Sequence, residues 1–301
     1  MTNRSITAVE GLAVGHWSDP EAATGCTVIL CPPSRCVASG LALGGAPATR
    51  EGDLLAPEKM MPRIDAVVLS GGSAFGLAAA QGVMRWLEQQ GRGFATGSGP
   101  VPIVVAASIY DLEVGRADIR PDEQAGFAAA DAASMGPVAA GRVGAGCGAS
   151  CGVYLGYDKA VPTGIGTAAL SFGGATIGAL AVSNPAGDLY DPERGELIAG
   201  HGLATHEIAS RLSGYTGQAN TTLVVVATDA PLVKQEAAAL SVAAHAGVAR
   251  VTRPSHTIFD GDMAYVLSTC QGPAVALGPL CVLVQDVVAE AVLAAARARA
   301  A

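Results

Sequence analysis

The sequence has few aromatic side chains and few charges for its length. Of its 301 residues, 4% are aromatic and 15% are charged, whereas 50% are hydrophobic and 39 are glycine. The chain can therefore bury a substantial core, and its many glycines allow helices and strands to approach closely. Basic residues are scarce as well: Lys and Arg total 18, only three of them lysines, for a net charge of -8. This balance argues against a nucleic-acid or anionic-membrane partner.

Signals for secretion, membrane insertion and metal binding are also missing. The first residues lack an apolar segment long enough for a signal peptide, and no uninterrupted apolar stretch reaches spanning length, so we expect a cytoplasmic protein. The seven cysteines are odd in number and scattered, which favours reduced thiols over a disulfide framework. The five histidines show no zinc-type spacing, and we expect neither a metal nor another cofactor.

The hydrophobic pattern predicts one domain, 1–301, in which stacked sheets are covered by outer helices. Short apolar runs between Gly, Pro and Asp turns predict strands at 7–14, 26–31, 37–43, 64–70, 165–171, 176–183, 221–228, 250–259 and 263–269. Apolar residues at helical spacing predict helices at 77–90, 122–134, 231–247 and 283–299. Residues 185–220 are more polar and predict helix pieces and an exposed loop that runs into Asn220.

The most informative stretch is Asn220-Thr221-Thr222, which precedes an apolar run. One interpretation is an ordinary strand start, because β-branched residues fit a pleated sheet. The other interpretation is that Thr221 is a nucleophile whose α-amine is still held in a peptide bond. If the Asn220–Thr221 bond were broken, Thr221 would carry an α-amine with a pKa of about 8, which can take the proton of its own hydroxyl near neutral pH.

A glycine-rich turn follows the predicted strand 64–70. Gly71-Gly72-Ser73 lies between this strand and a helix N-terminus, where backbone N–H groups could donate to an anion or an oxyanion. The alternative is a structural turn with glycines that allow close packing. A P-loop lysine is missing, and Phe75 replaces the second glycine of a nucleophile elbow, so a Ser73 hydrolase with His256 as partner is a distant alternative.

Two further polar motifs have both structural and chemical interpretations. Asn184-Pro185 follows a valine-containing strand and is either a turn or the source of an amide donor for an oxyanion. Asp260-Gly261-Asp262 lies between two apolar runs and is either a hairpin turn or a carboxylate pair that orients an ammonium group.

In combination, these segments resemble the P1 family of self-cleaving N-terminal-nucleophile hydrolases. That family includes L-aminopeptidase/D-esterases, β-peptidyl aminopeptidases and 6-aminohexanoate-oligomer (nylon oligomer) hydrolases. The resemblance extends from about Gly11 to the C-terminal helix. Its landmarks occur in order: Gly15-His16-Trp17, Thr24-Gly25-Cys26-Thr27-Val28, Gly44 to Glu51, Ser70 to Leu77, Val101 to Val104, Ile109-Tyr110-Asp111, Gly144-Ala145-Gly146, Gly164 to Ala168, Ser183-Asn184-Pro185, Asn220-Thr221-Thr222 and Asp260-Gly261-Asp262.

The resemblance implies a four-layer α/β/β/α fold and a precursor that cuts itself into an α chain, 1–220, and a β chain, 221–301. It implies that Thr221 attacks the Asn220 carbonyl and later a substrate amide, through an acyl-enzyme. Asn184 and Tyr110 would stabilise the oxyanion or orient substrate, while Asp260 and Asp262 would hold the ammonium. Homo-oligomers of the cleaved heterodimer are implied as well.

One departure from the family concerns a lysine. Relatives carry it after the Gly144-Ala145-Gly146 loop or just before the next Gly-x-Gly, whereas Val153 stands at the early position here and Lys159 is the one lysine between them. Lys159 is either a catalytic helper or a solvated loop residue.

The expected activity is hydrolysis of a small amide or peptide substrate. α-Peptides, D-amino-acid esters, β-peptides and ω-amino-acid oligomers all remain open. Two other functions compete with it: acyl transfer on the same fold, and a small-ligand-binding protein that no longer cleaves itself.

Overall fold

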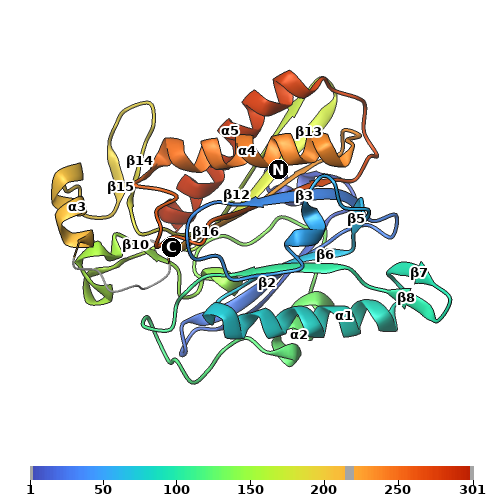
Figure 1. Cartoon of the computed structure of the whole chain (residues 1–301), viewed down its shortest axis with the longest axis horizontal. Coiled ribbons are helices and arrows are strands. Elements are labelled where there is room, and N and C mark those ends of the chain that lie inside the picture. Colours follow the sequence, from blue (N-terminus) through green and yellow to red (C-terminus); the bar gives the residue numbers. More distant parts are fainter. Residues whose placement is uncertain (1–2, 214–219, 299–301) are drawn as a thin grey trace.

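Two β-sheets stacked face to face form the centre of the computed structural model, which describes residues 3–213 and 220–298. Helices cover the outer face of each sheet, so that the layers run α/β/β/α from α4 and α5 to α1 and α2 (Figure 1). This is the architecture predicted from the sequence.

The first sheet has the strand order β1-β2-β6-β9-β4, and the second has the order β12-β13-β16-β18-β3-β5. The strands of the first sheet are β1 Ala13–Asp19, β2 Thr24–Leu30, β6 Ala66–Ser70, β9 Val104–Ser108 and β4 Thr49–Arg50. Those of the second are β12 Ile165–Phe172, β13 Ala175–Asn184, β16 Thr221–Thr228, β18 Met263–Ser268, β3 Cys36–Ala42 and β5 Arg63–Ile64. Smaller ladders are formed by β7 Phe94–Thr96 with β8 Gly99–Val101, β10 Ser150–Cys151 with β11 Val161–Pro162, and β14 Asp188–Tyr190 with β15 Leu197–Ala199 and β17 Thr252–Arg253.

The helices are amphipathic or largely apolar segments that pack on these sheets. They are α1 Ala79–Gln89, α2 Glu123–Asp131, α3 Thr205–Leu212, α4 Lys234–Val251 and α5 Leu277–Arg297. Short 3-10 turns lie at η1 Ile6–Ala8, η2 Asp53–Leu55, η3 Ser73–Ala78, η4 Gly144–Gly146, η5 Val153–Leu155 and η6 Tyr157–Lys159.

The inner strands are continuous apolar runs because both of their faces are buried. In β16, Leu223 and Val225 lie in the core between the two sheets, whereas Val224 and Val226 lie in the core beneath α4 and α5. A third core lies between the first sheet and the helices α1 and α2. Strands buried on both faces lose the usual alternation of polar and apolar residues, which is why the sequence predicted them as uniform hydrophobic segments.

Helix α5 is long and apolar enough to cross a membrane by length and composition alone, and 56% of the relevant window is buried inside the structure. It packs against β12, β13 and α4. Core helices of globular proteins share these properties.

Two predicted strands differ from the structure. Residues 7–14 form mainly a turn, and β1 begins at Ala13. Here Ile6, Val9 and Leu12 fill the core between the sheets without strand pairing. The strand predicted at 250–259 is also wrong: only 252–253 pair as a strand, and α4 runs to Val251.

The error at 250–259 has a local cause. Val248 and Val251 are both buried and continue the inner face of α4 beyond the predicted end of the helix at 247. The β-branched side chain of Val251 fits a strand as well, which is why the sequence placed it in one. The last helix begins at Leu277, earlier than the predicted position 283.

Helices α1 and α2 cross at a glycine contact. A Cβ atom at Gly126 would lie 1.9 Å from the Ala79 carbonyl oxygen, and one at Gly82 would lie 1.8 Å from the Glu123 carbonyl oxygen. We expect Gly126→Ala to lower the free energy of unfolding by about 1–3 kcal/mol, because the added methyl forces the helices apart. Denaturant unfolding measures this. Gly97→Ala is the control, since nothing lies within 4 Å of its Cβ position, and equal stability of the two variants would contradict the prediction.

Candidate active site

Thr221 is the first residue of β16, an inner strand of the second sheet. On one side β13 runs antiparallel and places Asn184 opposite Thr221, and on the other side β18 runs parallel. Thr221 is 2% exposed and Asn220 is fully buried. We call the Asn220–Thr221 peptide and its immediate neighbours the junction. The expectation of an exposed loop is therefore wrong at the junction, while residues 214–219 of that loop lie outside the described residues.

The carbonyl oxygen of the Asn220–Thr221 peptide accepts two hydrogen bonds. The Thr221 Oγ1 hydroxyl donates to it over 2.5 Å, and the Gly261 N–H donates over 2.6 Å. The Asn220 N–H in turn donates to the Phe259 carbonyl. A Cβ atom at position 261 would lie 2.4 Å from the Ala46 carbonyl oxygen and 2.9 Å from Thr221 Oγ1. Glycine is therefore the residue that lets this amide approach the junction so closely.

Asp262 reaches the junction because the parallel strands β16 and β18 begin at the same edge of the sheet. Its Oδ1 accepts the Thr222 N–H at 2.5 Å, and its Oδ2 lies 2.6 Å from His256 Nδ1. No antiparallel hairpin flanks Asp260-Gly261-Asp262, so the hairpin interpretation of this motif is wrong.

Asp260 is fully buried on the other side of Gly261. Its carboxylate accepts N–H groups from Ala186 at 3.2 Å and from Thr257 at 2.9 Å, and the Thr257 hydroxyl lies 2.5 Å away. Burial, and next the negative charge of Asp262, raise the pKa of Asp260 above its usual range, against the opposing effect of these hydrogen bonds. The two carboxylates therefore form an electrostatically coupled pair at the junction.

Asn184, the last residue of β13, connects the second sheet to two loops. Its Oδ1 accepts the Ser150 N–H at 2.9 Å, and its Nδ2 donates to the Tyr110 carbonyl oxygen at 3.3 Å. The Tyr110 hydroxyl donates to Glu113 at 3.1 Å, and its ring lies 6.0 Å from the Tyr157 ring. Asn184 thus ties the Tyr110 backbone to the edge of the sheet where Thr221 lies.

Gly71, Gly72 and Ser73 were candidates for an oxyanion or substrate loop, but their amides already have acceptors. The three N–H groups donate to Gly25 O, Asp111 Oδ1 and Ile109 O. In this conformation none of them is free to donate to an oxyanion. The turn is structural here: Gly72 and Ser73 have positive φ angles, and Asp111 is buried beneath them.

The two remaining candidates, Lys159 and His256, do not take the positions that the sequence suggested for them. Lys159 is exposed on η6, and its side chain forms no hydrogen bond or ion pair within the described part of the chain. Its role as a helper stays a prediction. His256 is bonded to Asp262 through Nδ1 and faces the His245 carbonyl through Nε2, so it does not serve Ser73 as a base.

Several residues at the junction were not predicted there from the sequence. These are Gly261, Ser150, Tyr157 and Thr257, together with His256, which the sequence suggested as a partner for Ser73. Tyr157 donates to Asn220 Oδ1 at 3.5 Å. The Asp260-Gly261-Asp262 motif contained a signal for Gly261, since a glycine between two candidate carboxylates allows close backbone approach.

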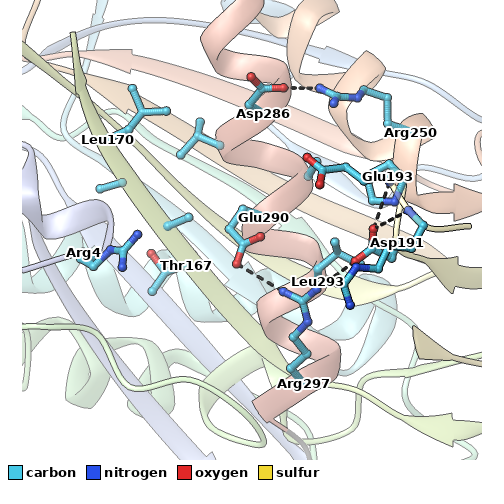
Figure 2. Close-up of a pocket in the computed structure, with 16 residues that line it drawn as sticks. Arg4, Thr167, Leu170, Asp191, Glu193, Arg250, Asp286, Glu290, Leu293 and Arg297 are labelled. Carbon is cyan, nitrogen blue, oxygen red and sulfur yellow. Dashed lines mark hydrogen bonds and ion pairs between the residues drawn. The ribbon is translucent and has the colours of Figure 1, made fainter. Parts of the chain in front are cut away.

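A large hollow lies elsewhere on the surface, beside β12 and α5. It has a volume of about 860 Å³ and is lined largely by charged side chains that pair with one another (Figure 2). Arg250 pairs with Asp286, and Arg297 bridges Asp191 and Glu290. None of the candidate site residues lines it.

Across 3–213 and 220–298, no group of three or more His, Cys, Asp and Glu side chains could hold a metal ion.

Comparisons with known proteins agree on one family. The profile of peptidase family S58 matches residues 4–300. An uncharacterized aminopeptidase of Mycobacterium tuberculosis is 43% identical over 288 residues, which cover 88% of this chain and 81% of the relative. A 6-aminohexanoate-oligomer endohydrolase of Kocuria sp. is 31% identical over 270 residues, covering 86% of this chain and 73% of the relative.

Solved structures show the same fold. The L-aminopeptidase D-Ala-esterase/amidase of Ochrobactrum anthropi, described as a variant of the Ntn hydrolase fold, superimposes with a TM-score of 0.74 at 22% identity, covering 98% of this chain and 86% of that chain. A Burkholderia sp. β-aminopeptidase gives the same TM-score, identity and coverage. The family expected from the sequence motifs is confirmed: the chain belongs to peptidase family S58 and is a hydrolase of peptide or amide bonds with an N-terminal-nucleophile hydrolase fold.

Proposed function

We propose that the chain is an N-terminal-threonine amide hydrolase that activates itself by cleaving the bond between Asn220 and Thr221. The observation that carries this proposal is the pair of hydrogen bonds on the Asn220 carbonyl, from the Thr221 hydroxyl at 2.5 Å and from the Gly261 amide at 2.6 Å. The Thr221 hydroxyl as nucleophile and the Gly261 N–H as hydrogen-bond donor to the carbonyl oxygen meet at one peptide group. Acyl transfer requires both.

In the first reaction, Thr221 Oγ1 forms a bond to the Asn220 carbonyl carbon. The Gly261 N–H stabilises the negative charge that develops on the oxygen. The carbon–nitrogen bond then breaks, the Thr221 nitrogen takes the proton lost by the hydroxyl, and an ester remains. Water hydrolyses this ester, leaving a carboxylate on Asn220 and a free hydroxyl and α-amine on Thr221.

In the second reaction, the released α-amine of Thr221 removes the proton from Oγ1 as it attacks a substrate amide. The protonated amine then donates to the leaving amine, and water hydrolyses the acyl-enzyme. Asp260 and Asp262 hold the ammonium form, and Asn184 orients the substrate through its contacts at the same edge of the sheet. The Gly261 amide, freed from the Asn220 carbonyl, serves the substrate oxyanion as well.

The substrates are small amides with a free amino group, of the peptide, β-peptide or ω-amino-acid oligomer type. Relatives named as an aminopeptidase and as a 6-aminohexanoate-oligomer endohydrolase support this class. A panel of α-peptide, β-peptide and 6-aminohexanoate-oligomer amides, together with D-amino-acid esters, identifies the preferred one.

Self-cleavage distinguishes the two adjacent threonines. Thr221→Val keeps the side-chain shape but removes the nucleophile, so we expect the chain to stay intact and hydrolysis to fall by more than about a thousandfold. Thr222→Val is the matched control, because the buried Thr222 hydroxyl has no hydrogen-bond partner among the described residues. Intact mass spectrometry and N-terminal sequencing measure the outcome. A fragment beginning at Thr222, or cleavage of Thr221→Val at the wild-type rate, would falsify the proposal.

Gly261→Ala tests the amide donor. The added methyl collides with the Ala46 carbonyl and crowds Thr221 Oγ1, so the Gly261 N–H moves away from the Asn220 carbonyl. We expect self-cleavage to slow by about 10²–10³-fold, the usual effect of losing one oxyanion donor. Time-resolved intact mass measures the rate, with Gly97→Ala as the control. Processing of Gly261→Ala at the control rate would show that this amide is not the donor.

A further inference from the structure

His256 lies between two groups that can only accept hydrogen bonds. Its Nδ1 is 2.6 Å from Asp262 Oδ2, and its Nε2 is 3.3 Å from the His245 backbone carbonyl oxygen. An ionised carboxylate and a carbonyl have no hydrogen to give, so with Asp262 ionised each ring nitrogen carries a proton. The geometry therefore identifies His256 as an imidazolium.

The neighbouring His245 is in the opposite state. Its Nε2 is 2.8 Å from the Leu41 carbonyl oxygen, while its buried Nδ1 has no hydrogen-bond partner in the part of the chain that the structure describes. One proton on Nε2 satisfies this environment, and burial lowers the pKa of His245. Its neutral ring lies edge-on to His256, with the ring centres 4.9 Å apart.

The imidazolium is connected to the nucleophile strand through one carboxylate. Asp262 accepts one backbone N–H on each carboxylate oxygen, from Thr222 on Oδ1 and from His256 on Oδ2. Hydrogen bonds to the charged form favour it, so these two backbone donors favour an ionised Asp262 independently of the His256 ring. Burial opposes the charge on His256, and the hydrogen bond and charge of Asp262 outweigh it, so the pKa of His256 lies above its usual value.

The titratable groups facing His256 come from two places. Asp260 and Asp262 lie in the segment before β18, and His245 lies on α4. Although its pKa is raised, Asp260 receives only N–H and O–H donors, from Ala186 and Thr257, which favour its charged form. With both carboxylates ionised and one imidazolium present, the junction has a net charge of about -1 before the Thr221 amine is released.

We propose that His256 is a positioning residue of the reaction: as an imidazolium it holds Asp262 on the Thr222 amide and offsets one of the two carboxylate charges beside the Thr221 amine. This inference rests on the proposed function. Two uncompensated carboxylates would stabilise the ammonium form of Thr221, which cannot act as a base. With His256 charged, a single net negative charge remains, enough to orient the amine while leaving it able to lose its proton near neutral pH.

The test is the pH dependence of kcat for His256→Asn, with His245→Asn as the matched control. The panel substrate that the wild-type chain hydrolyses fastest is used, and intact mass first establishes that each protein has a fragment beginning at Thr221. The acidic limb of kcat reports the Thr221 ammonium in the enzyme–substrate complex. We expect this limb to move upward by about one pH unit in His256→Asn, because a nearby positive charge has been lost. The limb should stay in place in His245→Asn, which removes a neutral ring and keeps the backbone carbonyl.

A processed His256→Asn enzyme whose limb stays at the wild-type pH, with only kcat reduced, overturns the inference and leaves the proposed function intact. If wild-type chain yields no fragment at Thr221, the proposed function itself fails. A second measurement applies even when His256→Asn does not process: nitrogen NMR of wild-type protein with labelled histidines, assigned by the signal lost in His256→Asn. Protons on both ring nitrogens of His256 at pH 7 support the inference, and a neutral ring overturns it.

Discussion

The parallel pairing of β16 with β18 is the constraint on which the candidate site depends. Parallel neighbours start at the same edge of a sheet, so the residues that precede β18 lie beside the residues that precede β16. This brings the Gly261 amide to the Asn220 carbonyl and the Asp262 carboxylate to the Thr222 amide. Antiparallel β13 ends at the same edge and adds Asn184. Three strands thus converge on one peptide bond.

Much of the architecture could be predicted because it follows from local patterns. Apolar runs such as 221–228 are long enough and uniform enough to indicate strands buried on both faces, and such strands need covering layers on each side. The segment 250–259 could not be assigned in this way. β-Branched residues at its start fit a helix face as well as a strand, and burial against α5 and the sheet decides in favour of the helix.

The candidate site was partly predictable for a different reason. Thr221, Asn184, Asp260 and Asp262 stand out as polar residues at the ends of apolar runs, so their chemistry is visible in the sequence. The hydrogen-bond partners of polar and backbone groups, in contrast, cannot be read from the sequence. The amides of Gly71 to Ser73 are suitable for an anion in principle, but their acceptors come from Gly25, Ile109 and Asp111, which only the tertiary structure brings to them. His256 was given the wrong partner, Ser73, because its actual contacts are a carboxylate and a carbonyl that the fold brings to it.

The strand order of the second sheet has a consequence for the proposed self-cleavage. Residues after Asn220 supply β16 and β18, which lie between β13 and β3 from the earlier part of the chain. A break after Asn220 removes none of the ladder hydrogen bonds, so the two pieces remain interlocked and cannot separate without unfolding. The groups that meet at the junction are brought together by the finished sheet. Cleavage would then depend on complete folding. A chain that has not assembled its second sheet would stay uncleaved and inactive, and every cleaved chain would already be folded.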